Sequence, residues 1–372
     1  MTSLTGQIFA IVGVLSLVII FHEFGHLLVA KWRKLPVYEF SLGFGPIIWQ
    51  RTIADTQYVV RPILLGGYVR IAGLDPGDEH PEGFDKHNGF VRSAVLLAGP
   101  LMNLVLAALI FTWVGLMWGE EVGDTTVVQR VLHGSPAAKA GLLPGDKVLR
   151  INGEVVDRFQ YGDQVDQYIY PSPHPSLVEW VRDNPKQSLL FSVLRDGREL
   201  DITIVPDSVP FPHEDADSGR IVTTTIGQIG LKPVKIRKPV SPLVAVAAGV
   251  SHPFYLAKEM IRMLGWTVTG RAPAQVVGPV GITGMMRENL ELGWGEFLSF
   301  SATLSVIIGV MNLLPFPGLD GGRLLFIAVE GVIRRRLNRQ AEAIVHTVGI
   351  GLVLMLVLGI TIKEVVELVT PK

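Results

Sequence analysis

Ile8–Ala30 reads IFAIVGVLSLVIIFHEFGHLLVA, and this stretch decides the class of the protein. It is apolar over the roughly 20 residues that a helix needs to cross a bilayer. Near its C-terminal end, however, it holds His22, Glu23 and His26. Met1–Gln7 contains no Lys or Arg, and no small-residue cleavage site follows the run. We therefore interpret it as a retained helix and not as a signal peptide.

Three further runs are long and apolar enough to span a membrane: Ser93–Trp118, Phe297–Leu319 and Ala343–Ile362. The composition agrees, with 48% hydrophobic residues, a mean hydropathy of +0.39 and only 18% charged residues, against about 25% in soluble domains. A net charge of −1 gives no reason to expect a nucleic-acid partner. The sequence predicts a polytopic α-helical membrane protein with about four transmembrane helices.

Basic residues near the ends of these runs predict the orientation, because Lys and Arg favour the cytoplasmic side. If all four runs span, both basic clusters fall on one side of the membrane. We therefore expect both termini, and the stretch from about 120 to 240, to be extracytoplasmic. The first cluster follows the first run and the second lies between the third and fourth runs: Lys31, Arg33 and Lys34; Arg323, Arg334, Arg335, Arg336 and Arg339.

Shorter features lie between the spans. Tyr58–Ala72 reads as two strands around a Gly66-Gly67 turn, a β-hairpin that is either associated with the membrane or exposed on the surface. Ser241–Leu264 mixes apolar and charged residues, which predicts an amphipathic helix along the membrane surface. Gly278–Gly281 is expected to form a tight turn.

Thr126–Val234 has the composition of a soluble domain. Its turns, two short helices and a hairpin at Leu189–Val205 predict a small α+β, partly open barrel. Residues 135–154, SPAAKAGLLPGDKVLRINGE, resemble a bacterial PDZ domain. The expected division is residues 1–118 for the first two spans and the hairpin, 119–235 for the PDZ domain, 236–296 for the surface helix and connector, and 297–372 for the last two spans.

His22-Glu23-Phe24-Gly25-His26 is an H-E-x-x-H motif. On a helix, residues i and i+4 share one face, so the two histidines can bind one zinc ion, with Glu23 placed to accept a proton from water. Polar groups inside a membrane span are costly unless they bind something. The alternative is a buried polar network that joins helices.

A third ligand is needed, and the chain has no cysteine. The best candidate is Asp320 in the run 312–322, NLLPFPGLDGG, whose prolines and glycines break the third span. A broken helix within the bilayer is tolerated only where it is covered by protein or lines a wet cavity. The alternative for Asp320 is a carboxylate that caps a loop at the membrane surface.

These motifs together resemble the site-2 protease family of intramembrane zinc metalloproteases, in its RseP/RasP-like bacterial branch with one PDZ domain. The resemblance also covers GFGP at 43–46, AGPLMN at 98–103 and GPVGI at 278–282. It implies one Zn²⁺ per chain, held by His22, His26 and Asp320, with Glu23 as the catalytic base. It gives Asn312 and Asn103 a role in binding substrate or stabilising the oxyanion.

The resemblance also implies an activity: hydrolysis of a peptide bond within a transmembrane segment, in regulated intramembrane proteolysis. Expected substrates are single-pass membrane proteins, such as anti-sigma factors or signal-peptide remnants, after a first cut by a site-1-type protease. The enzyme would be a multi-pass protein of the bacterial inner membrane, with its active site toward the cytoplasmic side. The PDZ peptide-binding loop would include Gly227, Ile229 and Gly230.

Two uses of the PDZ domain stay open at this point: it either excludes substrates with bulky external domains or binds a newly made C-terminus. The main rival function is a catalytically inactive, membrane-anchored PDZ scaffold. A transporter would also explain a broken helix, but no inverted repeat is visible. The four spans exclude a soluble zinc protease.

Overall fold

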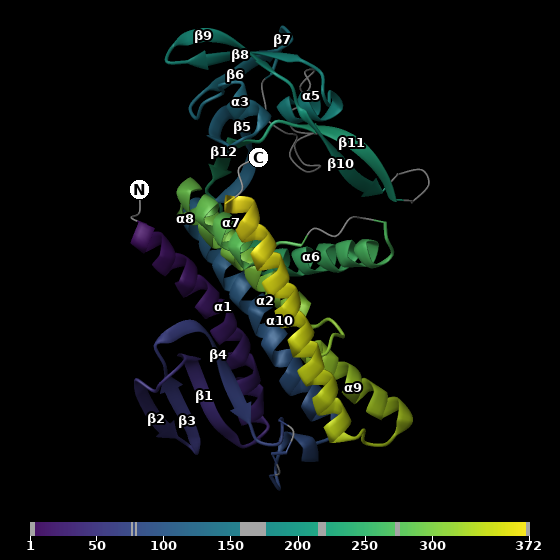
Figure 1. Cartoon of the computed structure of the whole chain (residues 1–372). Coiled ribbons are helices and arrows are strands. Elements are labelled where there is room, and N and C mark those ends of the chain that lie inside the picture. Colours follow the sequence, from purple (N-terminus) through teal and green to yellow (C-terminus); the bar gives the residue numbers. More distant parts are fainter. Residues whose placement is uncertain are drawn as a thin grey trace. The chain divides into compact units, whose positions relative to one another are not determined.

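The computed structural model describes residues 4–75, 77–78, 80–156, 176–214, 221–271 and 276–369. The chain forms two compact units (Figure 1). The first comprises Met1–Val114, Val246–Arg262 and Gln275–Lys372, and the second comprises Gly115–Ala245 and Met263–Ala274.

The first unit contains the long helices, and four of these are apolar enough to cross a membrane among the residues described. The four candidate spans lie within α1, α2, α8 and α10, which confirms the predicted set. The helices of this unit are α1 (Leu4–Trp32), α2 (Gly89–Trp118), most of α6 (Pro242–Val268), α7 (Pro279–Leu292), α8 (Trp294–Asn312), α9 (Asp320–Ile333) and α10 (Arg339–Val369), with a 3₁₀ turn at Phe84–Lys86.

The third span is shorter than the predicted Phe297–Leu319, because α8 ends at Asn312. Pro315 and Pro317 cannot donate a helical hydrogen bond, and Gly318 adopts a φ of +97°. Residues 313–319 therefore fold as a tight loop, which delivers the chain to α9. The predicted turn at Gly278–Gly281 is wrong, since Gly278 is the N-cap of α7 and helix begins at Pro279.

A four-stranded sheet lies beside the C-terminal half of α1 (Figure 1). Its order is β2-β3-β1-β4, and β1 pairs in parallel with β3 and antiparallel with β4. The strands are β1 (Val37–Phe44), β2 (Trp49–Ile53), β3 (Thr56–Val60) and β4 (Ile63–Ile71).

The predicted hairpin around Gly66-Gly67 is therefore wrong, because both glycines lie inside β4. Gly67 allows close packing, since a Cβ there would lie 2.4 Å from the carbonyl oxygen of Ser41 in β1, and Gly66 adopts a φ of +125°. The tight turn of this sheet instead joins β2 to β3 at Ala54 and Asp55, which both have positive φ.

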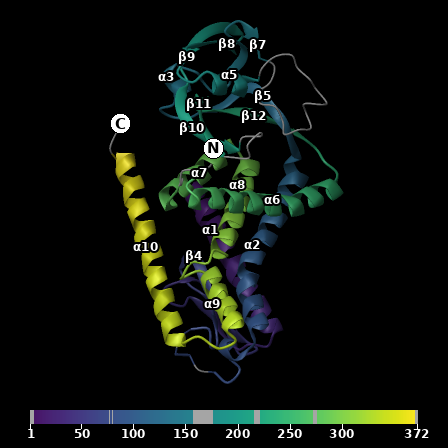
Figure 2. The ribbon, with the colours of Figure 1, turned by 90° about the vertical axis from the view of Figure 1, so that its right-hand side faces the viewer.

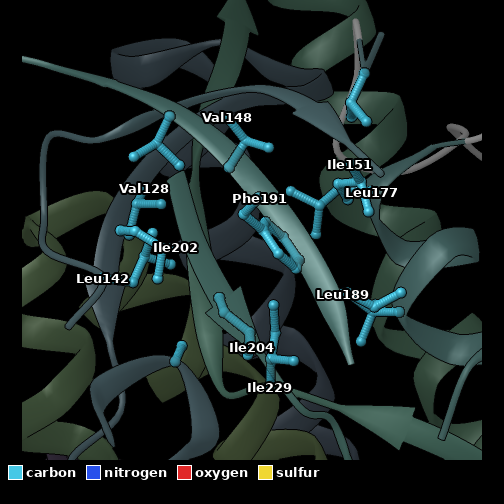
Figure 3. Close-up of a cluster of buried hydrophobic side chains, with 14 residues drawn as sticks. Val128, Leu142, Val148, Ile151, Leu177, Leu189, Phe191, Ile202, Ile204 and Ile229 are labelled. Carbon is cyan, nitrogen blue, oxygen red and sulfur yellow. The ribbon is translucent and has the colours of Figure 1, made fainter. Parts of the chain in front are cut away.

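The second unit contains a six-stranded sheet of order β12-β5-β6-β8-β9, with β7 paired to β6, and a separate two-stranded sheet of β10 and β11. Its core gathers around the fully buried Phe191 of β8 (Figure 3). Its elements are β5 (Glu120–Val131), α3 (Pro136–Lys139), β6 (Lys147–Ile151), β7 (Glu154–Val155), α5 (Leu177–Asp183), β8 (Leu189–Arg195), β9 (Arg198–Ile204), β10 (Asp207–Glu214), β11 (Ile221–Gln228) and β12 (Leu231–Lys238).

The β8–β9 hairpin and α5 occur where the sequence places a hairpin and a short helix. Assignment of this unit to the PDZ class stays a prediction. The predicted amphipathic helix is present as α6 (Pro242–Val268), and its position at a membrane surface stays a prediction.

Candidate metal centre

His22 and His26 lie one turn apart on α1, and both side chains are buried. Their rings meet edge to face, and the two Nε2 atoms are 3.2 Å apart. Asp320, the first residue of α9, lies beside them: its Oδ2 is 3.1 Å from Nε2 of His22 and 3.3 Å from Nε2 of His26. The fold thus brings together the three side chains that the sequence selects as ligands.

The position of Asp320 depends on the two glycines that follow it. A Cβ on Gly321 would lie 2.2 Å from the carbonyl oxygen of Leu314, and one on Gly322 would lie 2.3 Å from that of Phe316. Only residues without a Cβ let the first turn of α9 pack this tightly against the preceding loop. The glycines of the LDGG run therefore place the carboxylate.

A hydrogen bond on the far side of the ring sets the tautomer of His26, and the amide of Asn103 can set that of His22. Nδ1 of His26 is 2.8 Å from the carbonyl oxygen of Val95, which can only accept, so Nδ1 carries the proton and Nε2 holds a lone pair. The side-chain amide of Asn103 is 3.4 Å from Nδ1 of His22, and its Oδ1 has no partner among the described residues. Rotating this amide by 180° brings Oδ1 to accept from Nδ1–H of His22, which frees Nε2 of that ring as well.

This donor set fits a zinc ion. The Nε2 lone pairs of the two histidines and one carboxylate oxygen of Asp320 then point toward one another with no proton between them. Three acceptors this close together repel one another unless a cation lies between them. In a tetrahedral zinc site, bonds of about 2.0–2.1 Å hold the ligand atoms about 3.3 Å apart. The observed separations of 3.1–3.3 Å agree. Three protein ligands leave the fourth position for water or substrate, as in catalytic sites.

Glu23 is bound to the sheet. Its Oε2 accepts a hydrogen bond of 3.1 Å from the backbone N–H of Val69 in β4. Further along the same strand, the carbonyl oxygen of Leu64 accepts a hydrogen bond from Oγ of Ser16 on α1. The two contacts fix β4, an end strand of the sheet, next to the helix that carries the H-E-x-x-H motif.

Gly99 of α2 is a site residue that the sequence analysis missed. A Cβ there would lie 2.4 Å from Nε2 of His26 and 2.9 Å from Cε1 of His22. Gly99 therefore makes room for both rings on the side where a metal binds. The AGPLMN run at 98–103 marks this segment, but it does not reveal the packing requirement, because the contact joins helices that are distant in sequence.

Other predicted site residues have different surroundings. Nδ2 of Asn312 donates to the carbonyl oxygen of Ile308 in its own helix. Ile229 is a core residue of the second unit, and its carbonyl oxygen accepts from the N–H of Ala137. Gly230 has a φ of +71°, and a Cβ on Gly227 would collide with the carbonyl oxygen of Val181. Each thus has a structural role, and the binding roles stay predictions.

Known proteins provide an independent comparison. Residues 9–356 match the family described as Peptidase family M50. A zinc metalloprotease RasP of Geobacillus kaustophilus is 28% identical over 440 residues, covering 96% of this chain and 97% of that protein. A putative zinc metalloprotease of Mesorhizobium japonicum is 32% identical, covering 94% and 95%, and one of Rhizobium meliloti is 33% identical, covering 92% and 91%.

Proposed function

The chain belongs to peptidase family M50 and is a zinc metalloprotease, and from this premise we propose that it hydrolyses a peptide bond within a transmembrane segment of its substrate. The observation that supports this proposal best is the position of His22 and His26. Both lie inside a candidate span, Thr5–Trp32, whose mean hydropathy is 2.2. A peptide bond would have to enter the bilayer to reach them.

His22, His26 and Asp320 would hold the zinc ion, which supplies an acidified water and a polarised carbonyl group when bound. Glu23 takes the proton from the attacking water and gives it to the leaving amine. The N–H of Val69 holds the Glu23 carboxylate in place, while Val95 and Asn103 hold the two rings. Such outer contacts typically change metal affinity 10- to 100-fold, roughly.

The first experiment measures zinc per purified chain in the wild type, His22→Ala and His252→Ala. His252 is an exposed histidine of α6 whose ring contacts Phe111, so it controls for the loss of an imidazole. We expect about one zinc in the wild type and the control and almost none in His22→Ala. Equal zinc in all three preparations would refute the assigned site.

Activity requires a second experiment, with a single-pass membrane protein in proteoliposomes and Glu23→Gln as the inactive control. We expect the wild type to cut within the substrate's hydrophobic segment and Glu23→Gln to keep zinc without cutting. Cleavage only outside the hydrophobic segment would contradict the intramembrane proposal. Zinc binding without cleavage of any tested segment would favour the membrane-anchored scaffold.

We further propose that the unwound substrate binds as an added strand along β4, because β4 is an end strand and, among the described residues, pairs with a strand on one side only. The proposal predicts photo-crosslinking to substrate from a probe at Leu64 of β4 in the Glu23→Gln background. Ile53 of β2, at the opposite end of the sheet, is the matched control, since the two side chains are 46% and 50% exposed. Equal crosslinking at both positions would contradict binding at β4.

The proposed substrates are single-pass membrane proteins, such as anti-sigma factors or signal-peptide remnants, already shortened by a site-1-type protease. The second unit would act as the PDZ gate that rejects uncut proteins. One transmembrane substrate, presented with and without a folded external domain, tests this: only the short form should be cut. Rapid cleavage of both forms would contradict the proposal that the second unit excludes uncut proteins. A requirement for a particular free C-terminus would instead favour binding of a newly made C-terminus by the second unit.

The proposed topology places the second unit outside the bacterial inner membrane and the α9–α10 loop in the cytoplasm. The chain has no cysteine, so single cysteines can report on each side. Gln187→Cys in the second unit should react with a membrane-impermeant maleimide on intact spheroplasts. Arg335→Cys should react only after lysis, and the reverse pattern would invert the topology.

A further inference from the structure

A cavity of about 520 Å³ lies within the first unit, apart from the three proposed ligands. Its walls come from the start of α2, residues 73–75 and 84–86, both the first turn and the C-terminal half of α9, the loop after α9 and the first turns of α10. In Figure 2 the end of α9 and the start of α10 meet at the bottom of the ribbon, where their connecting loop runs.

The cavity is lined with charge. Ion pairs join Arg339 to Asp85 at 3.1 Å, Arg323 to Asp75 at 3.6 Å, and Arg92 to Glu330. Five basic side chains face four acidic ones, so the lining carries one excess positive charge: Lys86, Arg92, Arg323, Arg336 and Arg339; Asp75, Asp85, Glu330 and Glu342. The Arg336 and Arg339 side chains are 51% and 39% exposed, so a ligand can reach them, although Arg336 also donates to the carbonyl oxygen of His87 and Arg339 to that of Gly73.

Two lining residues hold buried donors without a partner. Nδ1 of His346 accepts a 2.9 Å hydrogen bond from the N–H of Gly318, so a neutral ring must carry its proton on Nε2. Among the described residues, neither this Nε2 nor the Nε of Arg92 finds an acceptor. Buried donors are rarely left unpaired in native proteins. The cavity therefore calls for an occupant that is rich in acceptor oxygens.

A third unpaired polar atom among the described residues indicates that the ligand must also carry a hydrogen-bond donor. Oδ1 of Asp85 is a buried acceptor for which the described part of the chain offers no donor. An occupant that supplies acceptor oxygens to the two N–H groups and a donor to Asp85 completes the set. A phosphodiester whose alcohol part carries an ammonium or a hydroxyl group has this combination.

The location also favours a lipid. Arg92 is the fourth residue of α2 and Arg339 the first of α10, so the cavity lies where two candidate spans begin. This is the depth of phospholipid headgroups, and basic pockets between membrane helices recognise them. Just beyond the cavity, α10 exposes apolar side chains such as Val348 and Leu352, at 56% and 50%. Acyl chains can cover them.

We propose that this cavity binds the phosphodiester headgroup of a glycerophospholipid. Arg336 and Arg339 contact the phosphate at the mouth, and the N–H groups of Arg92 and His346 complete its coordination. The bound headgroup would join α10 to α2 and α9. Because His346 also holds Gly318, two residues before Asp320, the lipid would steady the loop that places this proposed ligand.

The test is native mass spectrometry of the delipidated full-length chain in detergent, titrated with phosphatidylglycerol, phosphatidylethanolamine or inorganic phosphate alone. We expect one lipid per chain at low concentration. The variant Arg336→Gln/Arg339→Gln should bind it at least fivefold more weakly. The control Arg334→Gln/Arg335→Gln removes the same charge from exposed neighbours outside the lining, and should change the affinity less than twofold.

Arg339 also donates a hydrogen bond to the carbonyl oxygen of Gly73, so its substitution could disturb the fold. A second variant controls for this effect. Ala343→Leu narrows the cavity from α10 without removing an ion pair, and should weaken lipid binding similarly while zinc content stays unchanged. Equal losses in the two arginine pairs would overturn the proposal in favour of bulk attraction. Absence of lipid binding in the wild type would overturn it too, as would inorganic phosphate that displaces lipid with equal affinity.

Discussion

The sharpest test of the metal centre is Gly99→Ala. The added Cβ would lie 2.4 Å from Nε2 of His26 and 2.5 Å from its Cε1, whereas ordinary contacts begin at about 3.4 Å. The ring, or α2 itself, must therefore move by about 1 Å. Metal ligands tolerate about 0.2 Å. The substitution should cost far more than its single methyl group suggests.

The size of the loss follows from this displacement. Disturbing an outer contact of a ligand costs 10- to 100-fold, roughly, in metal affinity, and Gly99→Ala displaces a ligand itself. We expect zinc affinity to fall by at least about 100-fold, or about 2.8 kcal/mol, with proteolysis falling in parallel. A loss of helix stability cannot explain the lower zinc affinity, because Ala stabilises a helix by about 1 kcal/mol relative to Gly.

The assay is zinc content and competition with a chelator in purified protein. Gly13→Ala is the matched control: it makes the same substitution on α1, where a Cβ meets nothing within 4 Å. Gly13→Ala should keep the wild-type affinity. Gly99→Ala with stoichiometric zinc and an affinity within about threefold of the wild type would refute the packing argument, and with it the assigned ligand positions.

Three other predictions concern different parts of the chain. Asn103→Ala should lower zinc affinity 10- to 100-fold, roughly, by releasing His22, and unchanged chelator competition would contradict this. Burial alone would raise the pKa of the Asp146 carboxyl, but the Arg195 guanidinium, at 2.7 Å, outweighs burial and holds that pKa below its ordinary value of 3.8. This pair therefore stabilises the second unit above about pH 4, and the stabilisation is lost as the pH falls further. Below about pH 4, backbone hydrogen exchange in β8 should become faster in the wild type. In Asp146→Asn the exchange rate should show no corresponding increase. Glu364→Gln should destabilise the first turn of α7 by about 1 kcal/mol, because Glu364 accepts a hydrogen bond of 2.7 Å from the N–H of Gly278. Hydrogen exchange at that turn should be faster in Glu364→Gln and unchanged in the control Glu367→Gln.

Local patterns predict much of this structure. The four spans follow from length and hydropathy, and the pairing of His22 with His26 follows from helical periodicity. Asp320 was identified because a carboxylate beside a broken helix in a membrane has few other uses. Each of these inferences needs only the residues of a single segment and the solvent around it.

The errors arise where contacts join distant segments. Gly66-Gly67 has the local signal of a turn, but Gly67 is required by the carbonyl oxygen of Ser41 on another strand. The sequence analysis does not predict helix α9, since two glycines, which are poor helix formers, follow its first residue. The roles of Gly99 and Asn103 depend on α2 crossing α1, which no property of their own segment records.

The separation of Asp320 from His22 by 298 positions has a consequence for biosynthesis. While the chain is being made, its first span enters the membrane long before the ribosome reaches the third ligand. Until then the nascent protein holds only two of the three proposed ligands. The proposed zinc site therefore cannot be completed before nearly all of the candidate spans have been made.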